Sequence, residues 1–240
     1  MPSVTSLLMA VHRVVCDDLP NILSMRRNIA WKDDGSPVTE ADLRVEQNVY
    51  AFLSQHLPSL TFISEESYVA GADGEAAVTA SGWTAVLDPI DGTENFCSGF
   101  KEWGVSLSIW RDCVHQGSAI FLPELGDRLI NGDRLEYQRS RIIGFSSTIT
   151  DELAARVALT QEARIMGCAA YNLFNVTRGA LAGFSNPAGA KSWDILAGLM
   201  LAREHGCHID VEGALYDGHY LRPDRKYRFD IRHRYDLHPG

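Results

Sequence analysis

The chain has 240 residues, with 31 Asp and Glu against 22 Lys and Arg, so its formal net charge is −9 at pH 7. Hydrophobic residues make up 45% and charged residues 22%, which is typical of globular proteins and argues against a disordered chain. The excess of acids argues against a nucleic-acid polymer or an anionic membrane surface as partner. It does not exclude a small anionic substrate, because a bound divalent cation can invert the charge of an acidic site.

The cellular location is predicted from three absences. The first residues carry His12 and Arg13 and lack the basic leader, apolar block and cleavage site of a secretory signal. No stretch reaches about 18 uninterrupted apolar residues, as a membrane span would require. The five cysteines are scattered, odd in number and without a C-x-x-C pair, a pattern typical of free thiols in a reducing compartment. We therefore expect a soluble, cytoplasmic protein.

In the first half, apolar residues at three- and four-residue spacing predict a helix within the first 30 residues. The segment 32–37 contains Gly and Pro and predicts a turn. Thr39 is a good N-cap for a second helix from Glu40 to about His56. Three apolar residues of this helix are expected to face the core: Leu43, Val49 and Leu53. Three strands are then predicted: 60–64, 83–87 and 105–110.

The second half is predicted to open with a strand over 142–145. Three helices follow: 151–159, 171–179 and 194–205. Interleaved strands and helices indicate an α/β or α+β class. Charged residues and an Asn-Gly-Asp segment interrupt the apolar pattern near 130–141, so we place a boundary there, between residues 1–135 and 136–240.

Paired acids at a strand end are the sharpest chemical feature. The segment 88–93 reads Asp-Pro-Ile-Asp-Gly-Thr and follows an apolar strand directly. Asp88 and Asp91 at such a rigid position suit a hard divalent metal. Gly92 permits close backbone approach, and Thr93 offers a hydroxyl to a phosphate oxygen or an attacking water. Taken alone, the segment also fits a solvated turn.

Three further acidic features are weaker individually. Glu65 and Glu66 end the preceding strand, where neighbouring side chains point to opposite faces, so one of them can enter a site. Asp194 opens an apolar helix, where a first-turn acid is also favoured by the helix dipole. Asp42 lies in the first turn after Thr39, where it also fits an ordinary capping role.

Together, four segments resemble the inositol monophosphatase superfamily, which includes inositol phosphatases, 3′(2′),5′-bisphosphate nucleotidases, histidinol phosphatases and some fructose bisphosphatases. They are Lys32-x-Asp34-Gly35-Ser36-Pro37-Val38-Thr39-Glu40-Ala41-Asp42, Ser64-Glu65-Glu66-Ser67, Asp88-Pro89-Ile90-Asp91-Gly92-Thr93-x-Asn95-Phe96 and Trp193-Asp194-Ile195-Leu196-Ala197-Gly198. The resemblance covers about residues 30–210. It implies an α+β fold, a layered αβαβα sandwich, and a Mg²⁺-dependent, typically lithium-sensitive phosphomonoesterase.

The resemblance also implies roles for individual residues. Two or three Mg²⁺ ions, with Mn²⁺ as an alternative, would be held by Glu65, Asp88, the Ile90 carbonyl, Asp91 and Asp194. Asp42 and Thr93 would position and activate the attacking water. Glu66 is counted with these catalytic residues. It would lie, with Lys32, behind the metal ligands or near an additional metal. The substrate and its phosphate would contact Gly92, Thr93, Cys168, Ala169 and Lys191. A carboxylate site of this kind fits Mg²⁺, which prefers oxygen ligands.

Two departures from the family pattern bear on the substrate. Inositol-specific members usually carry a Glu about seven residues before the late Asp, where this chain has Pro187, and the run 183–191 contains no acid. Lys191 instead places a cation near the site, and taken alone it fits an ordinary surface lysine slightly better. The middle, 122–132, is short where relatives carry a longer strand pair, so we expect the first half to lose peripheral strands. Family rules for a homodimer then need not apply.

The favoured hypothesis is a phosphatase for a small polyol, sugar or related monophosphate. Bisphosphate nucleotidase and histidinol phosphatase activities stay open within the superfamily. A haloacid-dehalogenase-type phosphatase is disfavoured, because its D-x-D motif has one intervening residue and Asp88 and Asp91 have two. An alternative of another class is a regulatory protein that binds a phosphate ligand on this fold without turnover.

Overall fold

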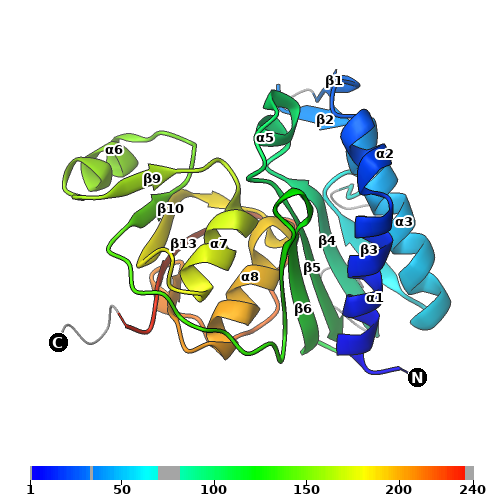
Figure 1. The fold of residues 1–240 in the computed structure, drawn as a ribbon. Helices are drawn as coiled ribbons and strands as arrows, with labels where there is room; N and C mark the ends of the chain where they lie inside the picture. The colour runs from blue at the N-terminus through cyan, green and yellow to red at the C-terminus, as the bar shows by residue number, and fades with distance from the viewer. Residues whose placement is uncertain (1, 33–34, 70–81, 236–240) are drawn as a thin grey trace.

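Two β-sheets, with helices between them and on their outer faces, form the frame of the protein (Figure 1). The computed structural model describes residues 2–32, 35–69 and 82–235. The layers run helix, sheet, helix, sheet, helix, which confirms the predicted α+β class and the αβαβα sandwich. No helix in the described parts of the chain is both long enough and apolar enough to cross a membrane.

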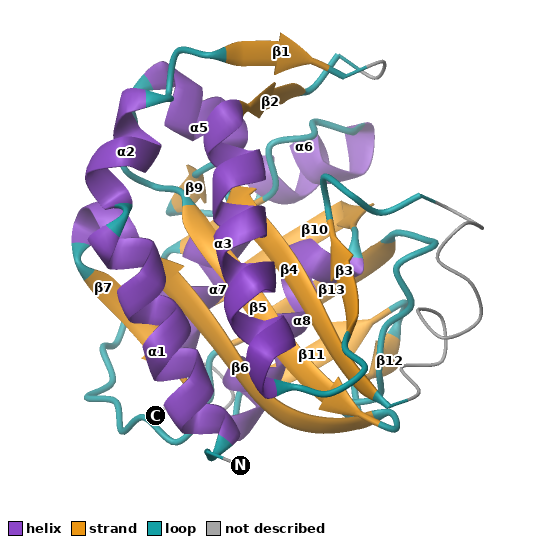
Figure 2. Ribbon diagram, turned by 90° about the vertical axis from the view of Figure 1, so that its right-hand side faces the viewer, coloured by secondary structure: helices purple, strands orange, loops and turns teal. Residues whose placement is uncertain are grey.

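The first sheet and its covering helices come from residues before 131. The elements are α1 (Val4–Asp17), α2 (Leu19–Ser24), β1 (Ile29–Trp31), β2 (Pro37–Thr39), α3 (Glu40–His56), β3 (Thr61–Ser64), β4 (Trp83–Asp91), α5 (Thr93–Ser98), β5 (Gly104–Arg111), β6 (Val114–Leu122), a 3-10 turn η1 (Pro123–Leu125) and β7 (Asp127–Ile130). The five-stranded sheet has the order β3-β4-β5-β6-β7, with β3 parallel to β4 and the other pairs antiparallel. Figure 2 shows α1 and α3 side by side across one face of it.

The second sheet comes from residues after 142. The elements are β8 (Ile143–Phe145), α6 (Asp151–Ala158), β9 (Ala163–Ile165), α7 (Ala169–Thr177), β10 (Gly183–Ala190), α8 (Ser192–Glu204), β11 (His208–Val211), β12 (Ala214–Leu215) and β13 (Tyr227–Arg232). The order is β12-β11-β13-β10-β8-β9. Helices α7 and α8 pack between the two sheets, so each sheet has an apolar core against them. The division of the chain at 135/136 stays a prediction.

The start of α3 is fixed by its sequence. The Thr39 side chain accepts the backbone N–H groups of Ala41 and Asp42, and the Asp42 side chain accepts that of Thr39, which forms the reciprocal capping box. The helix therefore begins where predicted. The inward position of Leu43 was wrong, however, since its side chain is 44% exposed.

Other differences concern elements that the sequence pattern did not reveal. The single N-terminal helix is divided into α1 and α2, because Pro20 begins a new helix after Asp18. Ten helices and strands were not predicted, and neither was the 3-10 turn η1: β1, β2, α5, β6, β7, β9, β10, β11, β12 and β13. The predicted turn at 32–37 includes Asp33 and Asp34, which lie outside the described residues.

A β-bulge in β4 prepares the site. Asp88 pairs with Ser106 on β5, but Asp91 pairs with Gly104, so β4 contains one extra residue between the two acids. Side chains of a regular strand alternate between faces, so residues three apart would point to opposite sides. One extra residue cancels that difference and places Asp88 and Asp91 on the same face, while Ile90 packs into the opposite core.

Candidate active site

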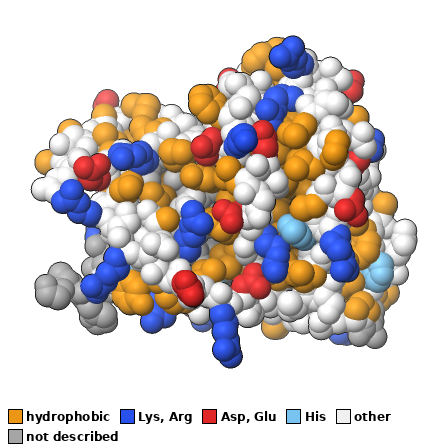
Figure 3. Space-filling view, viewed as in Figure 1, with side chains coloured by type: hydrophobic (Ala, Val, Ile, Leu, Met, Phe, Trp, Pro, Cys, Tyr) orange, Lys and Arg blue, Asp and Glu red, His pale blue; other side chains and the backbone are white. Residues whose placement is uncertain are grey.

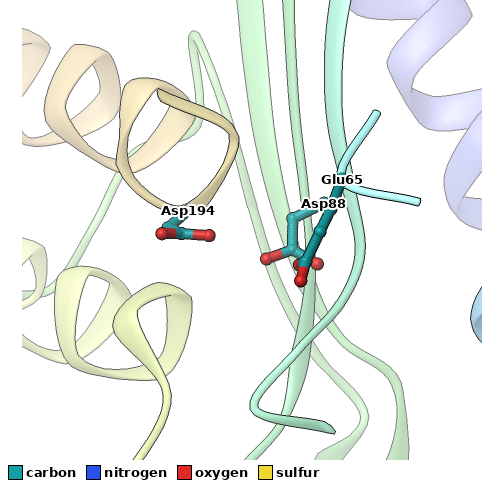
Figure 4. A group of neighbouring side chains, drawn as sticks. All are labelled: Glu65, Asp88 and Asp194. Atoms are coloured by element: carbon teal, nitrogen blue, oxygen red, sulfur yellow. The ribbon is translucent and has the colours of Figure 1, made fainter. Parts of the chain in front are cut away.

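Three carboxylates from three elements meet at one point. Glu65 follows β3, Asp88 lies in β4, and Asp194 lies in the first turn of α8. They offer oxygen atoms that all lie within 4.8 Å of one another. Figure 4 shows the three side chains pointing toward a common centre between α8 and the first sheet. The second half of the chain thus contributes one acid to a cluster begun by the first.

Asp91 lies beside this cluster and is held by α7. Its Oδ2 accepts the backbone N–H of Ala170, in the first turn of that helix. The Cys168 thiol donates to the carbonyl of Asp91 at 3.3 Å. Since Asp91 is only 9% exposed, these contacts fix its carboxylate at the junction of the two sheets.

The electrostatics of the cluster favour a cation. Burial raises the pKa of Asp88 well above its usual range, and the neighbouring Glu65 and Asp91 raise it further. Burial, followed by the charges of Asp91 and Glu65, likewise raises the pKa of Asp194. Burial is the main cause that raises the pKa of Asp91 to about 6. Close carboxylates of this kind disfavour their own ionisation, and a bound cation removes the conflict.

Asp42 and Thr93 form a second, adjoining unit. Asp42 Oδ2 accepts the backbone N–H of Thr39 at 2.8 Å and its hydroxyl at 2.5 Å. That leaves Oδ1 facing the Thr93 hydroxyl at 3.4 Å. The same hydroxyl donates to the Ile90 carbonyl at 2.9 Å. Burial raises the pKa of Asp42 to about 6.

Lys32 lies behind the cluster, between two acids. Its Nζ donates to Glu65 and to Glu66 at 2.8 Å each. Burial opposes its charge, but Glu65 and Glu66 together raise the pKa of the ammonium. Burial raises the pKa of Glu66 to about 7. Lys32 thus neutralises part of the acidic cluster from one side.

The donor set fits a hard divalent metal. Glu65, Asp88, Asp91 and Asp194 present only oxygen atoms, which Mg²⁺ prefers. Among the described residues, Asp88, Asp91 and Asp194 have no Lys, Arg or His within ion-pair distance. Uncompensated acids in such a buried group are costly, and a bound cation would offset that cost.

These acids open onto a cavity of about 320 Å³. Gly92 and Thr93 begin α5 at its wall, and Gly167, Cys168 and Ala169 form part of the facing wall. Gly92 adopts a left-handed φ of +85°, and a Cβ there would lie 2.9 Å from the Cβ of Cys168. Only glycine meets both conditions, so the two small-residue turns approach closely at this point.

Of the residues predicted to contact the substrate, Cys168 lines the cavity and Lys191 does not. Burial raises the pKa of the Cys168 thiol well above the usual range, so it is a neutral thiol at pH 7. The Lys191 Nζ donates to the Pro223 carbonyl at 3.3 Å and lies over the Trp193 ring.

The structure adds cavity residues that the sequence analysis missed. They are Ser146, Ser147 and Thr148 after β8, Asn172 on α7, Asn186 on β10 and Lys226 before β13. Asn186 is adjacent to Pro187, the position singled out for substrate recognition, and could have been found from it. Lys226 belongs to no motif and reaches the cavity because Tyr227 pairs with Ala190.

The sequence is similar to proteins of one family. A sequence model of the Inositol monophosphatase family matches residues 3–234. The inositol-1-monophosphatase of Mesorhizobium japonicum is 29% identical over 210 residues, which are 77% of this chain and 76% of that protein. Human inositol monophosphatase 1 is 26% identical over 231 residues, 85% of this chain and 80% of its own.

Solved structures share the fold at low identity. An IMPase/NADP phosphatase complexed with Mg²⁺ and phosphate has a TM-score of 0.78 at 18% identity, covering 96% of this chain and 90% of that one. A Staphylococcal inositol monophosphatase-1 in a LiCl-soaked inhibitory complex has a TM-score of 0.78 at 19% identity, with the same coverage.

The family match, together with the fold, defines a metal-dependent phosphatase. The chain belongs to the inositol monophosphatase family, and it is a Mg²⁺-dependent phosphoric monoester hydrolase.

Proposed function

We propose that the enzyme hydrolyses the monophosphate of a small polyol, sugar or related alcohol, with an activated water as nucleophile. The observation that carries the proposal is the convergence of Glu65, Asp88, Asp91 and Asp194 on the cavity that Thr93 also lines. Two or three divalent ions in such a carboxylate group would activate a water and neutralise the charge that develops in phosphomonoester hydrolysis. The size of the cavity suits a small substrate.

Four carboxylates and one carbonyl would hold the metal: Glu65, Asp88, Asp91, Asp194 and the Ile90 oxygen. Bound Mg²⁺ would neutralise charge on the phosphoryl group and acidify water in the site. The protein's own part is positioning. Gly92 and Thr93 begin α5, where backbone N–H groups without helical partners can receive phosphate oxygens.

Asp42 and Thr93 would orient the attacking water. Thr93 has one hydroxyl proton, which it can donate either to the Ile90 carbonyl or to Asp42 Oδ1. When it donates to Asp42, its oxygen lone pairs are free to accept a hydrogen bond from water. With a pKa of about 6, Asp42 is mostly ionised at pH 7.5, so Thr93 can pass its hydroxyl proton to Asp42 as it takes a proton from the attacking water.

We also infer inhibition by lithium, which is supported by the LiCl-soaked inhibitory complex of the Staphylococcal relative. Glu66 and Lys32 would keep Glu65 in place, since Lys32 contacts both carboxylates. The exact number of metal ions, a homodimer and a cytoplasmic location stay predictions from the sequence.

The test is phosphate release from a panel of polyol, sugar, nucleoside and amino-alcohol monophosphates, with Mg²⁺, with Mn²⁺ and with EDTA. We expect release that needs the metal, falls with added LiCl and is lost in Asp91→Asn. The matched control is Asp217→Asn, which removes an exposed acid paired with His219. Absence of release from every substrate with either metal would overturn the proposal. Equal release by the Asp91 variant and the wild type would remove Asp91 from it.

A further inference from the structure

The cavity has two walls of different chemical character. Five acids line it: the four proposed metal ligands and Glu94, which follows Thr93 in the sequence. The wall built by the second half carries hydroxyl and amide groups, among them Thr148 and Asn186. That wall also carries Lys226, which is the one Lys or Arg among the described residues that line the cavity.

Lys226 differs from the two other lysines near the site. Lys32 is bound to Glu65 and Glu66, and Lys191 donates to the Pro223 carbonyl. Lys226 is exposed and has no hydrogen bond or ion pair with any residue in the described part of the chain. Its ammonium is therefore not engaged by any described residue.

The backbone holds Lys226 in a fixed place. It precedes Tyr227, whose pairing with Ala190 joins β13 to the end of β10. Gly189 packs against it, since a Cβ on that glycine would lie 3.3 Å from the Lys226 Cβ. Gly189 and Ala190 also line the cavity, and the chain then runs through Lys191 into α8 and Asp194. The lysine thus stands beside the segment that delivers the last acid.

We propose that Lys226 binds a second anionic group on the leaving-group side of the substrate, a carboxylate or a second phosphate. This proposal rests on the proposed phosphatase function. The scissile phosphate goes to the metal and to the start of α5, so the far wall receives the part of the substrate that leaves. A neutral polyol offers only hydroxyls to that wall and leaves Lys226 unused. An anion there gains an ion pair with Lys226, and because this lysine is exposed, salt should weaken the pair.

The experiment uses two pairs of substrates whose members differ in charge on the leaving group. One pair is glycerol 2-phosphate and 2-phosphoglycerate, which adds a carboxylate. The other is fructose 1-phosphate and fructose 1,6-bisphosphate, which adds a phosphate. Within each pair, the charged member is the one with an anionic leaving group and the neutral member is the one with an uncharged leaving group. The readout is the ratio of kcat/KM for the charged member to kcat/KM for the neutral member, with saturating Mg²⁺ at 20 and 200 mM salt.

We expect the wild-type ratio to favour the charged member in at least one pair, and Lys226→Met to lower that ratio about tenfold, mainly through KM. Higher salt should shrink the preference, and Lys226→Arg should retain it. The control is Arg225→Met, which removes the neighbouring exposed cation; Arg225 lies over Tyr227 and outside the cavity lining. This control should keep the wild-type ratio. If only the ratio for the glycerol 2-phosphate pair falls in Lys226→Met, the group bound is a carboxylate; if only the ratio for the fructose pair falls, it is a second phosphate.

Three results would overturn the proposal. The wild type could show no preference for either charged member, Lys226→Met could leave the ratios unchanged, or Arg225→Met could lower them equally. Each of these ratios can be measured only if the members with an uncharged leaving group are hydrolysed, so the phosphatase function survives all three results. If no member of either pair releases phosphate with Mg²⁺, the proposed function fails and this assignment fails with it.

Discussion

Replacing Asp91 by asparagine separates the cost of burying a carboxylate from its use in holding a metal. Asp91 is 9% exposed, and burial raises its pKa from an ordinary 3.8 to about 6. At about 1.36 kcal/mol per pKa unit, keeping it ionised at pH 7.5 costs the metal-free fold about 3 kcal/mol. The amide has the same shape and no charge, and its oxygen can still accept the Ala170 N–H.

Without metal, the asparagine variant should therefore be more stable than the wild type by about 1–3 kcal/mol at pH 7.5, measured by urea unfolding in EDTA. The folded carboxyl has the raised pKa, so its contribution to stability is present below pH 3.8 and is lost as the pH rises through about 6. The advantage of the variant should accordingly fall to about 1 kcal/mol near pH 4.5 and disappear below pH 3.8.

Mg²⁺ should reverse the order of stability. A ligand at 1,000 times its Kd stabilises the fold by about 4.1 kcal/mol, which exceeds the advantage of the variant, and the variant should lose most of that gain. Its kcat/KM should fall at least about 100-fold, which is about 2.7 kcal/mol of transition-state stabilisation. A variant less stable than the wild type in EDTA at pH 7.5 would refute the argument about burial. Equal stabilisation of both proteins by Mg²⁺ would refute the argument about the ligand.

Three smaller changes test other parts of the structure. Thr93→Val removes the hydroxyl beside the site and should lower kcat about 100-fold, while Mg²⁺ still raises the unfolding midpoint. A variant that loses both its activity and its stabilisation by Mg²⁺ would contradict a role in water positioning. Gly198→Ala places a Cβ about 2.5 Å from Leu173, so overpacking of about 1–3 kcal/mol should exceed the helix-propensity gain of about 1 kcal/mol, giving a lower urea midpoint. Burial lowers the pKa of His115 to about 4, so the wild type should lose stability relative to His115→Gln as the pH falls from 6.5 to 4; parallel pH curves would contradict this.

Local signals predicted the elements that carry the acids. The reciprocal bonds of Thr39 and Asp42 mark the start of α3 within the chain's own sequence, so no distant contact was needed to place it. The inward face of that helix was harder to predict. Successive residues turn by about 100°, so Leu43 lies far around the helix from the buried row that contains Val49 and Leu53. Its apolar character alone suggested the wrong face.

The geometry of the cavity depends on contacts that a linear pattern does not contain. Residues 105–110 alternate in polarity, yet every position from Gly104 to Trp110 is buried, because helices cover both faces of the sheet. Ser106 is accommodated there by donating to the Trp193 carbonyl. Lys226 is likewise placed by strand pairing between β10 and β13, far from any acidic motif in the sequence.

The net charge of −9 acquires a local meaning from this arrangement. On the face drawn in Figure 3, acidic and basic side chains are interspersed, with no continuous basic surface among the atoms that are coloured. The concentrated negative charge lies instead in the cavity, where the bulge in β4 supplies Asp88 and Asp91 and α8 supplies Asp194. Neither sheet with its own helices holds the complete set of acids. A cation bound there would join β4 to the start of α8, so its binding energy would stabilise the packing of the first sheet against the helices that separate it from the second.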